Sequence, residues 1–247
     1  MNLETFFAEN PKAALALSGG VDSSFLLYAG LHCGAEVRPY YVKTAFQPAF
    51  ELRDALRLGR DAGVAVTVLP YEILSLPAVA ANPEDRCYFC KSAIFDRICR
   101  QARQDGYSLV LDGTNASDSC ADRPGMKALQ ERGVRSPLRE CGLTKDRIRA
   151  LSREAGLFTW DKPSYACLAT RIPAGTPITG EILSRVEQSE DALFRLGFSD
   201  FRVRVFHGAA RLQLRSDQLS RALERREDIR SALQPFFPLI FMDTEVR

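Results

Sequence analysis

The stretch from residue 13 to residue 31 constrains the fold more than any other part of the chain. Residues 13–17 are apolar, a turn with two adjacent glycines follows, and Val21, Phe25 and Leu26 then recur at helical spacing. A buried strand that passes through a tight turn into a helix is the first half of a strand–helix–strand unit. We therefore expect a sheet whose strands are connected by helices.

The same alternation continues over the first two thirds of the chain. The expected strands are 37–42, 64–69 and 109–111, and the expected helices are 49–62, 90–104 and 145–155, the last one capped by Thr144. Strands that alternate with helices of this length predict an α/β fold, with a Rossmann-type parallel sheet that is covered on both faces.

The pattern changes near residue 160. Residues 160–177 are rich in Pro, Gly and Thr, which is typical of a loop. The elements expected after it are a helix at 180–196, strands at 201–206 and 211–214 joined by a turn at 207–210, a helix at 217–233 and a strand at 239–242. We therefore expect two domains, residues 1–165 and a smaller α+β domain of residues 166–247.

The overall charge gives no support to nucleic-acid binding. Lys and Arg total 33, Asp and Glu total 31, and the net charge is +2, so no broad basic face is expected. The N-terminus lacks the basic and apolar stretches of a signal peptide. No window approaches the roughly 20 apolar residues of a membrane span. We expect a cytoplasmic protein without a membrane or nucleic-acid partner.

The turn after the first strand has the properties of a phosphate site. Gly19 and Gly20 allow the backbone N–H groups to approach a ligand, and the following helix adds partial positive charge. Ser18 and Ser23 carry hydroxyl donors. Asp22 would repel a phosphate unless Mg²⁺ lay between them, so it suggests a nucleotide bound with magnesium. The alternative is an ordinary strand-to-helix turn.

This segment resembles the SGGxDS motif of the PP-loop ATP pyrophosphatase superfamily, whose members bind adenine nucleotides and cleave ATP between its α and β phosphates. The resemblance implies that Ser18, Gly19, Gly20, Asp22 and Ser23 contact the pyrophosphate of ATP. Gly113 and Thr114 follow a later strand. They fit the same site, because ligands of open α/β sheets bind at the carboxyl ends of the strands.

Three of the seven cysteines stand in notable positions. Cys87 and Cys90 form a CxxC pair just before an expected helix, and Cys167 lies in the loop that follows the α/β region. A CxxC pair suits a redox pair, half of a zinc site or a cluster. Three thiolates could also hold a [4Fe–4S] cluster and leave one iron open, or they could be buried thiols with no shared role. The other cysteines, Cys33, Cys99, Cys120 and Cys141, are expected to be ordinary core or surface thiols.

Four stretches together carry a wider resemblance. Residues 18–23, 82–91, 133–138 and 160–179 are similar to the LarE family of ATP-dependent sulfur transferases, nearly over the full chain. This family builds the nickel-pincer nucleotide cofactor of lactate racemase. The resemblance implies that the enzyme adenylates a carboxylate of pyridinium-3,5-biscarboxylic acid mononucleotide and that sulfur then replaces AMP. It also implies a homo-oligomer, with contacts through the C-terminal domain.

The family uses two sulfur sources. Some members sacrifice one cysteine, which becomes dehydroalanine, and others hold a [4Fe–4S] cluster on three cysteines and deliver an added sulfide from it. Cys87, Cys90 and Cys167 imply the cluster type, supplied by a sulfide donor. A sacrificial Cys167 is the alternative.

Arginines near the cysteines suit an anionic substrate, because the guanidinium group matches both phosphate and carboxylate. Arg171 is the strongest candidate, and we place it with the three cysteines in the catalytic group. The further substrate candidates are Arg86, Arg135, Arg202 and Arg204, the last two on one face of an expected strand.

Glu190 matches a position that the resemblance associates with the substrate or a nearby metal. Gln213 stands where the family is expected to have a second glutamate, which puts a carboxylate metal site there in doubt. Three rival functions stay open at this point: a tRNA thiolase of the same superfamily, an ammonia-using synthetase, and a nucleotide-binding module without activity.

Overall fold

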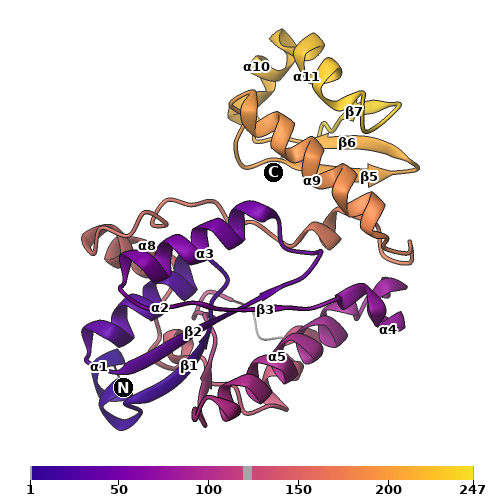
Figure 1. Cartoon of the computed structure of the whole chain (residues 1–247). Coiled ribbons are helices and arrows are strands. Elements are labelled where there is room, and N and C mark those ends of the chain that lie inside the picture. The colour runs from indigo at the N-terminus through magenta and orange to yellow at the C-terminus, as the bar shows by residue number, and fades with distance from the viewer. Residues whose placement is uncertain (1, 119–123, 247) are drawn as a thin grey trace. The chain divides into compact units, whose positions relative to one another are not determined.

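The computed structural model of the chain describes residues 2–118 and 124–246. The chain divides into two compact units (Figure 1). The first unit consists of Met1–Ile73 and Asp85–Lys162, and the second of Leu74–Glu84 and Pro163–Arg247. The chain therefore passes briefly into the second unit just before the CxxC pair. The roles expected for the C-terminal part, substrate binding and oligomerisation, stay predictions.

A four-stranded parallel sheet forms the centre of the first unit. Its strands are β1 (Lys12–Ala16), β2 (Glu36–Lys43), β3 (Thr67–Pro70) and β4 (Val110–Leu111), in the order β3-β2-β1-β4. The expected parallel α/β fold is confirmed, and it is consistent with the fold of the adenine nucleotide alpha hydrolases. β3 starts three residues later than predicted, because Val64 instead donates its N–H to Gly59 at the end of the preceding helix.

Helices cover both faces of this sheet, as Figure 1 shows. Ala13 and Leu15 of β1 face one hydrophobic core and Ala14 faces the other, as the alternation along a strand requires. The helices in the first core are α1 (Leu3–Glu9), α2 (Val21–His32), α3 (Ala49–Asp61), α7 (Pro137–Glu140) and α8 (Lys145–Glu154), and those in the second are α5 (Arg86–Gln104) and α6 (Pro124–Gln130). Among the described residues, no helix combines the length and apolar character that crossing a bilayer requires.

The helix α5 corrects one prediction about the CxxC pair. We expected a helix from residue 90, with the pair in front of it, whereas α5 begins at Arg86 and contains both cysteines. No glycine or proline follows Pro83 before the helix, so nothing in the chain prevents the helix from starting earlier. Cys87 and Cys90, three residues apart, therefore lie on the same side of one helical turn.

The second unit is built on a small mixed sheet. β5 (Arg202–Phe206) and β6 (Ala209–Gln213) are antiparallel, and β7 (Ile240–Met242) is parallel to β6. His207 and Gly208 form the tight turn, both with positive φ, so the strand resumes at Ala209, earlier than expected. The helix α9 (Gly180–Arg195) buries Leu183, Val186 and Leu193.

The expected helix at 217–233 is broken into shorter pieces. Arg225 is the C-cap of one helix and the N-cap of the next. Its guanidinium donates to the Leu196 carbonyl, a contact that takes the place of the continuous helix we expected. The pieces are η3 (Ser216–Gln218), α10 (Leu219–Glu224) and α11 (Arg226–Leu233). The other short turns are η1 (Ile73–Ser75), α4 (Pro77–Ala80) and η2 (Leu168–Arg171).

A buried asparagine connects the two separate segments of the second unit. The side-chain amide of Asn82 donates to the carbonyls of Pro173 and Thr176 at 2.8 and 3.0 Å. Asn82 also has a φ of 55°, a left-handed conformation that asparagine tolerates better than most residues. Its carbonyl in turn accepts from the Gly175 N–H at 2.8 Å. This one side chain therefore fixes the loop that follows η2.

Replacing Asn82 by alanine is expected to destabilise the protein. The Pro173 and Thr176 carbonyls would lose their donor, at a cost of about 1–3 kcal/mol, and alanine at positive φ would add about 1 kcal/mol. Asn82→Gly removes only the hydrogen bonds and should be the milder variant. Differential scanning calorimetry of the three proteins measures both effects. Equal stability of Asn82→Gly and wild type would show that the hydrogen bonds contribute little.

Candidate functional site

The glycine turn lies where the strand order of the first unit reverses. β2 and β3 follow on one side of β1, and the chain then returns to place β4 on the other side. The loops after β1 and β4 therefore leave the same edge of the sheet next to each other. This is the place where open α/β sheets bind their ligands.

The turn after β1 is held in shape by its own serines. Gly19 has a φ of 76°, and a Cβ there would lie 2.9 Å from the Glu51 carbonyl oxygen, so only glycine fits. The Ser18 and Ser23 hydroxyls lie 3.0 Å apart, and the Ser24 hydroxyl donates to the Gly20 carbonyl at 2.6 Å. These contacts give the loop a defined shape of its own.

The loop after β4 packs directly against this turn. A Cβ on Gly113 would lie 2.9 Å from the Ser23 backbone nitrogen, so glycine is required by the close approach of two backbones. The buried Asp112 accepts from the Ser136 hydroxyl at 2.5 Å and from the Thr114 hydroxyl. The structure thus brings together the predicted nucleotide residues of both loops.

Asp22 has a partner that the sequence analysis did not anticipate. Its carboxylate lies 2.5 Å from the Lys145 ammonium and 3.3 Å from the Asn115 amide nitrogen. A half-buried carboxylate beside a predicted phosphate turn would suit Mg²⁺, but here its charge is balanced by a lysine. Magnesium at Asp22 therefore stays a prediction.

A second lysine reaches the turn from the end of the first unit. The Lys162 ammonium donates to the Gly19 carbonyl at 2.9 Å and to Asp54 at 2.5 Å. Neither lysine was predicted from the sequence, although one signal was present. Lys145 is the first residue of α8, where the helix dipole disfavours a positive charge unless an anion lies nearby.

The CxxC pair lies at the N-terminal end of α5. Cys87 is exposed, Cys90 is half-buried, and the buried Arg86 donates to the Cys87 sulfur at 3.8 Å. Arg86 is thus placed beside a sulfur atom of the first unit.

Arg135 lies at the edge of the sheet of the first unit. Its backbone pairs with β4, its side chain binds Glu140, and its guanidinium covers the Phe6 ring at 4.6 Å. Any role in substrate binding stays a prediction.

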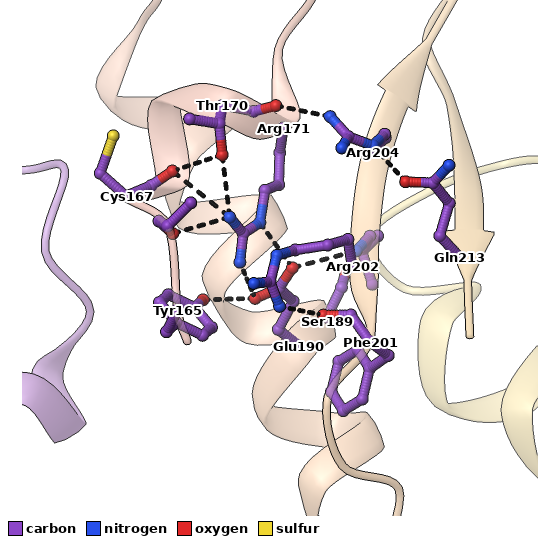
Figure 2. Close-up of polar contacts among 12 residues, drawn as sticks. Tyr165, Cys167, Thr170, Arg171, Ser189, Glu190, Phe201, Arg202, Arg204 and Gln213 are labelled. Carbon is purple, nitrogen blue, oxygen red and sulfur yellow. Dashed lines mark hydrogen bonds and ion pairs between the residues drawn. The ribbon is translucent and has the colours of Figure 1, made fainter. Parts of the chain in front are cut away.

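Cys167 lies in a loop of the second unit that is tied down by guanidinium groups, as Figure 2 shows. Arg171 donates to the Ala166 carbonyl at 2.7 Å and, more weakly, to the Cys167 carbonyl at 3.4 Å. The Thr170 hydroxyl donates to the Cys167 carbonyl at 2.8 Å. The thiol itself is half-buried.

Glu190 is fully buried and receives four hydrogen bonds. Arg171 donates to both of its oxygens at 2.9 and 3.1 Å, the Val203 N–H donates at 3.0 Å, and the Tyr165 hydroxyl donates as well. Burial, together with the Glu190 charge, raises the pKa of Tyr165, so that hydroxyl stays protonated. The Arg171 and Glu190 side chains are 0% and 1% exposed. The carboxylate is therefore enclosed by protein donors.

Arg202 and Arg204 project from one face of β5 toward the same loop (Figure 2). Arg202 donates to the Ser164 carbonyl at 2.7 Å, and Arg204 donates to the Thr170 carbonyl at 2.9 Å. Neither arginine forms an ion pair with any carboxylate among the residues that the structure describes. Burial and the nearby Arg171 charge lower the pKa of Arg202 to about 10, so it remains protonated at neutral pH.

Gln213 stands between Arg204 and Asp243. Its oxygen accepts from Arg204, and its nitrogen donates to Asp243 at 2.7 Å, while Arg211 neutralises Asp243. Within residues 2–118 and 124–246, no three His, Cys, Asp or Glu side chains gather into a metal-binding group. Of the remaining cysteines, Cys33 and Cys141 are half-buried and Cys99 is buried, whereas Cys120 lies outside the described residues.

Comparison with known proteins adds the family. No family model matches the chain. A pyridinium-3,5-bisthiocarboxylic acid mononucleotide synthase of Lactiplantibacillus plantarum is 31% identical over 90% of this chain and 82% of its own length. The chain belongs to the LarE family. Membership in this PP-loop family implies that the protein uses ATP.

The chain is also similar to two further proteins. An uncharacterised protein of Synechocystis is 39% identical over 90% of this chain and 84% of its own length. One of the chains of a glutamine-hydrolysing GMP synthase from Methanoculleus marisnigri is 27% identical over 61% of this chain and 52% of its own length.

Adding a methyl group at Gly113 is expected to weaken nucleotide binding. Its Cβ would press on the Ser23 backbone, and overpacking of this kind costs about 1–3 kcal/mol. If this strain displaces the Ser23 backbone, the affinity should fall by about 5- to 150-fold. Isothermal titration with a non-hydrolysable ATP analogue measures the change. Gly180→Ala is the control, because a Cβ there meets nothing within 4 Å. Equal affinity of Gly113→Ala and wild type would mean that the loop after β4 is not part of the nucleotide site.

Proposed function

We propose that this protein is an ATP-dependent sulfurtransferase that acts on pyridinium-3,5-biscarboxylic acid mononucleotide. It would adenylate a carboxylate of this substrate and replace AMP with sulfur, as a step in making the nickel-pincer nucleotide cofactor. The name of the Lactiplantibacillus relative, which describes the bisthiocarboxylic product, supports this choice of substrate.

The first unit supports the ATP part of the reaction. The Ser18–Ser23 turn offers N–H and hydroxyl donors, and Lys145 and Lys162 lie at its edge. Lysine is a common phosphate ligand because its ammonium is a compact charge with three donors. The partial match to a GMP synthase supports the same use of ATP.

The observation that carries the substrate assignment lies in the second unit. Arg202 and Arg204 lie against the Cys167 loop without a carboxylate partner among the described residues. Buried positive charges are costly unless an anion accompanies them. A substrate with a phosphate and two carboxylates would supply that anion.

The proposed chemistry is an acyl adenylation followed by a displacement. A carboxylate oxygen of the substrate attacks the α phosphorus of ATP, and the bond from that phosphorus to the bridging oxygen of pyrophosphate breaks. A sulfur nucleophile then attacks the acyl carbon and AMP leaves, which gives a thiocarboxylate. Adenylation is needed because a free carboxylate has no comparable leaving group.

Three cysteines are chemically suited to hold an iron–sulfur cluster, because such clusters are bound by cysteine sulfur atoms. Cys87 and Cys90 lie on one helical turn of α5, and Cys167 would be the third ligand. Such a cluster, when bound, would supply a replaceable sulfide on an iron that no cysteine holds. In the sacrificial alternative, the Cys167 sulfur attacks the acyl carbon. Loss of its Cα proton and cleavage of the Cβ–S bond then leave dehydroalanine.

Cys167→Ala is expected to separate the two halves of the reaction. Pyrophosphate release from ATP should persist, because the adenylation residues are intact, and formation of thiocarboxylate should stop. Enzymatic detection of pyrophosphate and mass spectrometry of the product measure the two steps after anaerobic purification.

Continued formation of thiocarboxylate by Cys167→Ala would contradict the role of this thiol. Iron and acid-labile sulfide in the wild type, with repeated turnover, support the cluster. A single turnover per chain, in which the Cys167 sulfur passes into the product and the mass of the residue falls by the equivalent of H₂S, supports the sacrificial route.

Gln213→Glu is expected to weaken substrate binding. The new carboxylate would neutralise Arg204, so the KM should rise about tenfold while kcat changes little, as for loss of a ground-state contact. Gln188→Glu adds the same charge on the exposed side of α9 and serves as control. Steady-state kinetics of the two variants test this, and an unchanged KM in Gln213→Glu would remove Arg204 from the substrate site.

A further inference from the structure

The loop that carries Cys167 is fixed mainly through its backbone carbonyls. Arg202, Arg171 and Arg204 donate to carbonyls at its start, middle and end. These carbonyls have no place in a sheet, so they need other donors. Three guanidinium groups take that role over residues 164–170.

Arg171 has the most direct effect on the thiol. It binds the carbonyls of Ala166 and Cys167, which belong to the peptide groups on either side of the Cys167 Cα. Because peptide groups are planar, fixing both of them fixes the direction of the Cα–Cβ bond. The sulfur atom then keeps only its rotation about χ1.

Glu190 in turn fixes the orientation of Arg171. The ion pair is bidentate, which holds the guanidinium in one plane. Glu190 is itself held by the Val203 N–H of β5 and by the Tyr165 hydroxyl, and the Arg171 guanidinium lies over the Tyr165 ring at 4.5 Å. A rigid chain of contacts therefore runs from the sheet to the Cys167 peptide groups.

Packing alone does not require this pair. Burying two charges costs desolvation energy, and two apolar side chains of similar volume often give the same or higher stability. Apolar side chains could not bind the Ala166 and Cys167 carbonyls. The particular property of the pair is thus its hydrogen bonding to the loop.

We propose that the Arg171–Glu190 pair is a positioning device that aims the Cys167 thiol for sulfur transfer. The inference rests on the proposed function in that it takes Cys167 as a participant in that step. It gives both residues a role through Cys167, in place of the expected direct contact with substrate.

The test replaces the pair by apolar residues of similar size. Arg171→Met/Glu190→Leu removes both charges together, so neither is left buried alone, and Arg215→Met/Asp217→Leu makes the same changes in an exposed pair of the same unit. Arg171→Lys keeps the charge but loses the planar fork. Calorimetry first establishes that each variant is folded.

Hydrogen exchange of the protein without substrate gives a readout that does not depend on activity. In the double variant, the Thr170 and Ile172 amides should exchange at least about tenfold faster, since the loop that contains them loses its anchor. Exchange in β6 and in the part of α9 away from Glu190 should be unchanged. Unaltered exchange in the loop would overturn the proposal.

Kinetics give the second readout. The kcat for thiocarboxylate formation should fall roughly 100-fold in the double variant, with a small change in KM, because misplacement of a reacting atom acts on the chemical step. The kcat of Arg171→Lys should also stay well below that of the wild type, because lysine keeps the charge but lacks the planar fork. A kcat equal to that of the exposed-pair control, or full activity in Arg171→Lys, would overturn the positioning role.

The two proposals fail differently. If the wild type forms no thiocarboxylate, the proposed function is wrong, and the exchange data alone decide whether the pair anchors the loop. If the wild type is active and the double variant is equally active, the positioning role is wrong and the function stands.

Discussion

Backbone carbonyls that have no sheet or helix partner must find other donors, and in this protein lysine and arginine side chains supply them. Lys162 binds the Gly19 carbonyl in the phosphate turn, and Arg171, Arg202 and Arg204 bind the carbonyls of the Cys167 loop. These bonds involve a charged donor and are stronger than ordinary ones. The geometry of the Cys167 loop depends on them, and in the turn after β1 Lys162 adds to the contacts that the serines make.

The same side chains have a second electrostatic effect. Under the proposed function, Lys162, Arg202 and Arg204 carry their positive charges to places where an anionic group of ATP or of the substrate would bind. A cation that has already lost part of its hydration in holding a carbonyl needs less reorganisation to meet an anion. Under the proposed function, the order of each loop and its affinity for an anion would therefore depend on some of the same residues.

The sequence predicted those parts of the fold that depend on local patterns. The apolar run of β1 and the helical spacing of Val21, Phe25 and Leu26 follow from burial on the two faces of one sheet. The glycines of the phosphate turn were identified because a tight turn between a strand and a helix requires them. The parallel order of the sheet follows from the alternation of strands and helices.

The contacts between distant residues could not be predicted in the same way. Nothing near Asp22 in the chain indicates Lys145, and nothing near Cys167 indicates that Glu190 orients Arg171. The start of α5 was placed too late because Pro83 and the three charged residues after it resemble a loop when they are taken alone. Arg171 and Glu190 were recognised as important, but their complete burial depends on tertiary packing.

The contact of Asn82 with residues 172–176 also sets an order of events in folding. The segment Leu74–Glu84 belongs to the second unit, whereas the residues between it and Pro163 belong to the first. On the ribosome the first unit can therefore close as soon as Lys162 has emerged, while this short segment has no partner until the chain beyond Pro163 follows. The second unit is therefore completed last, and it includes the segment Leu74–Glu84, which is synthesised well before the rest of that unit.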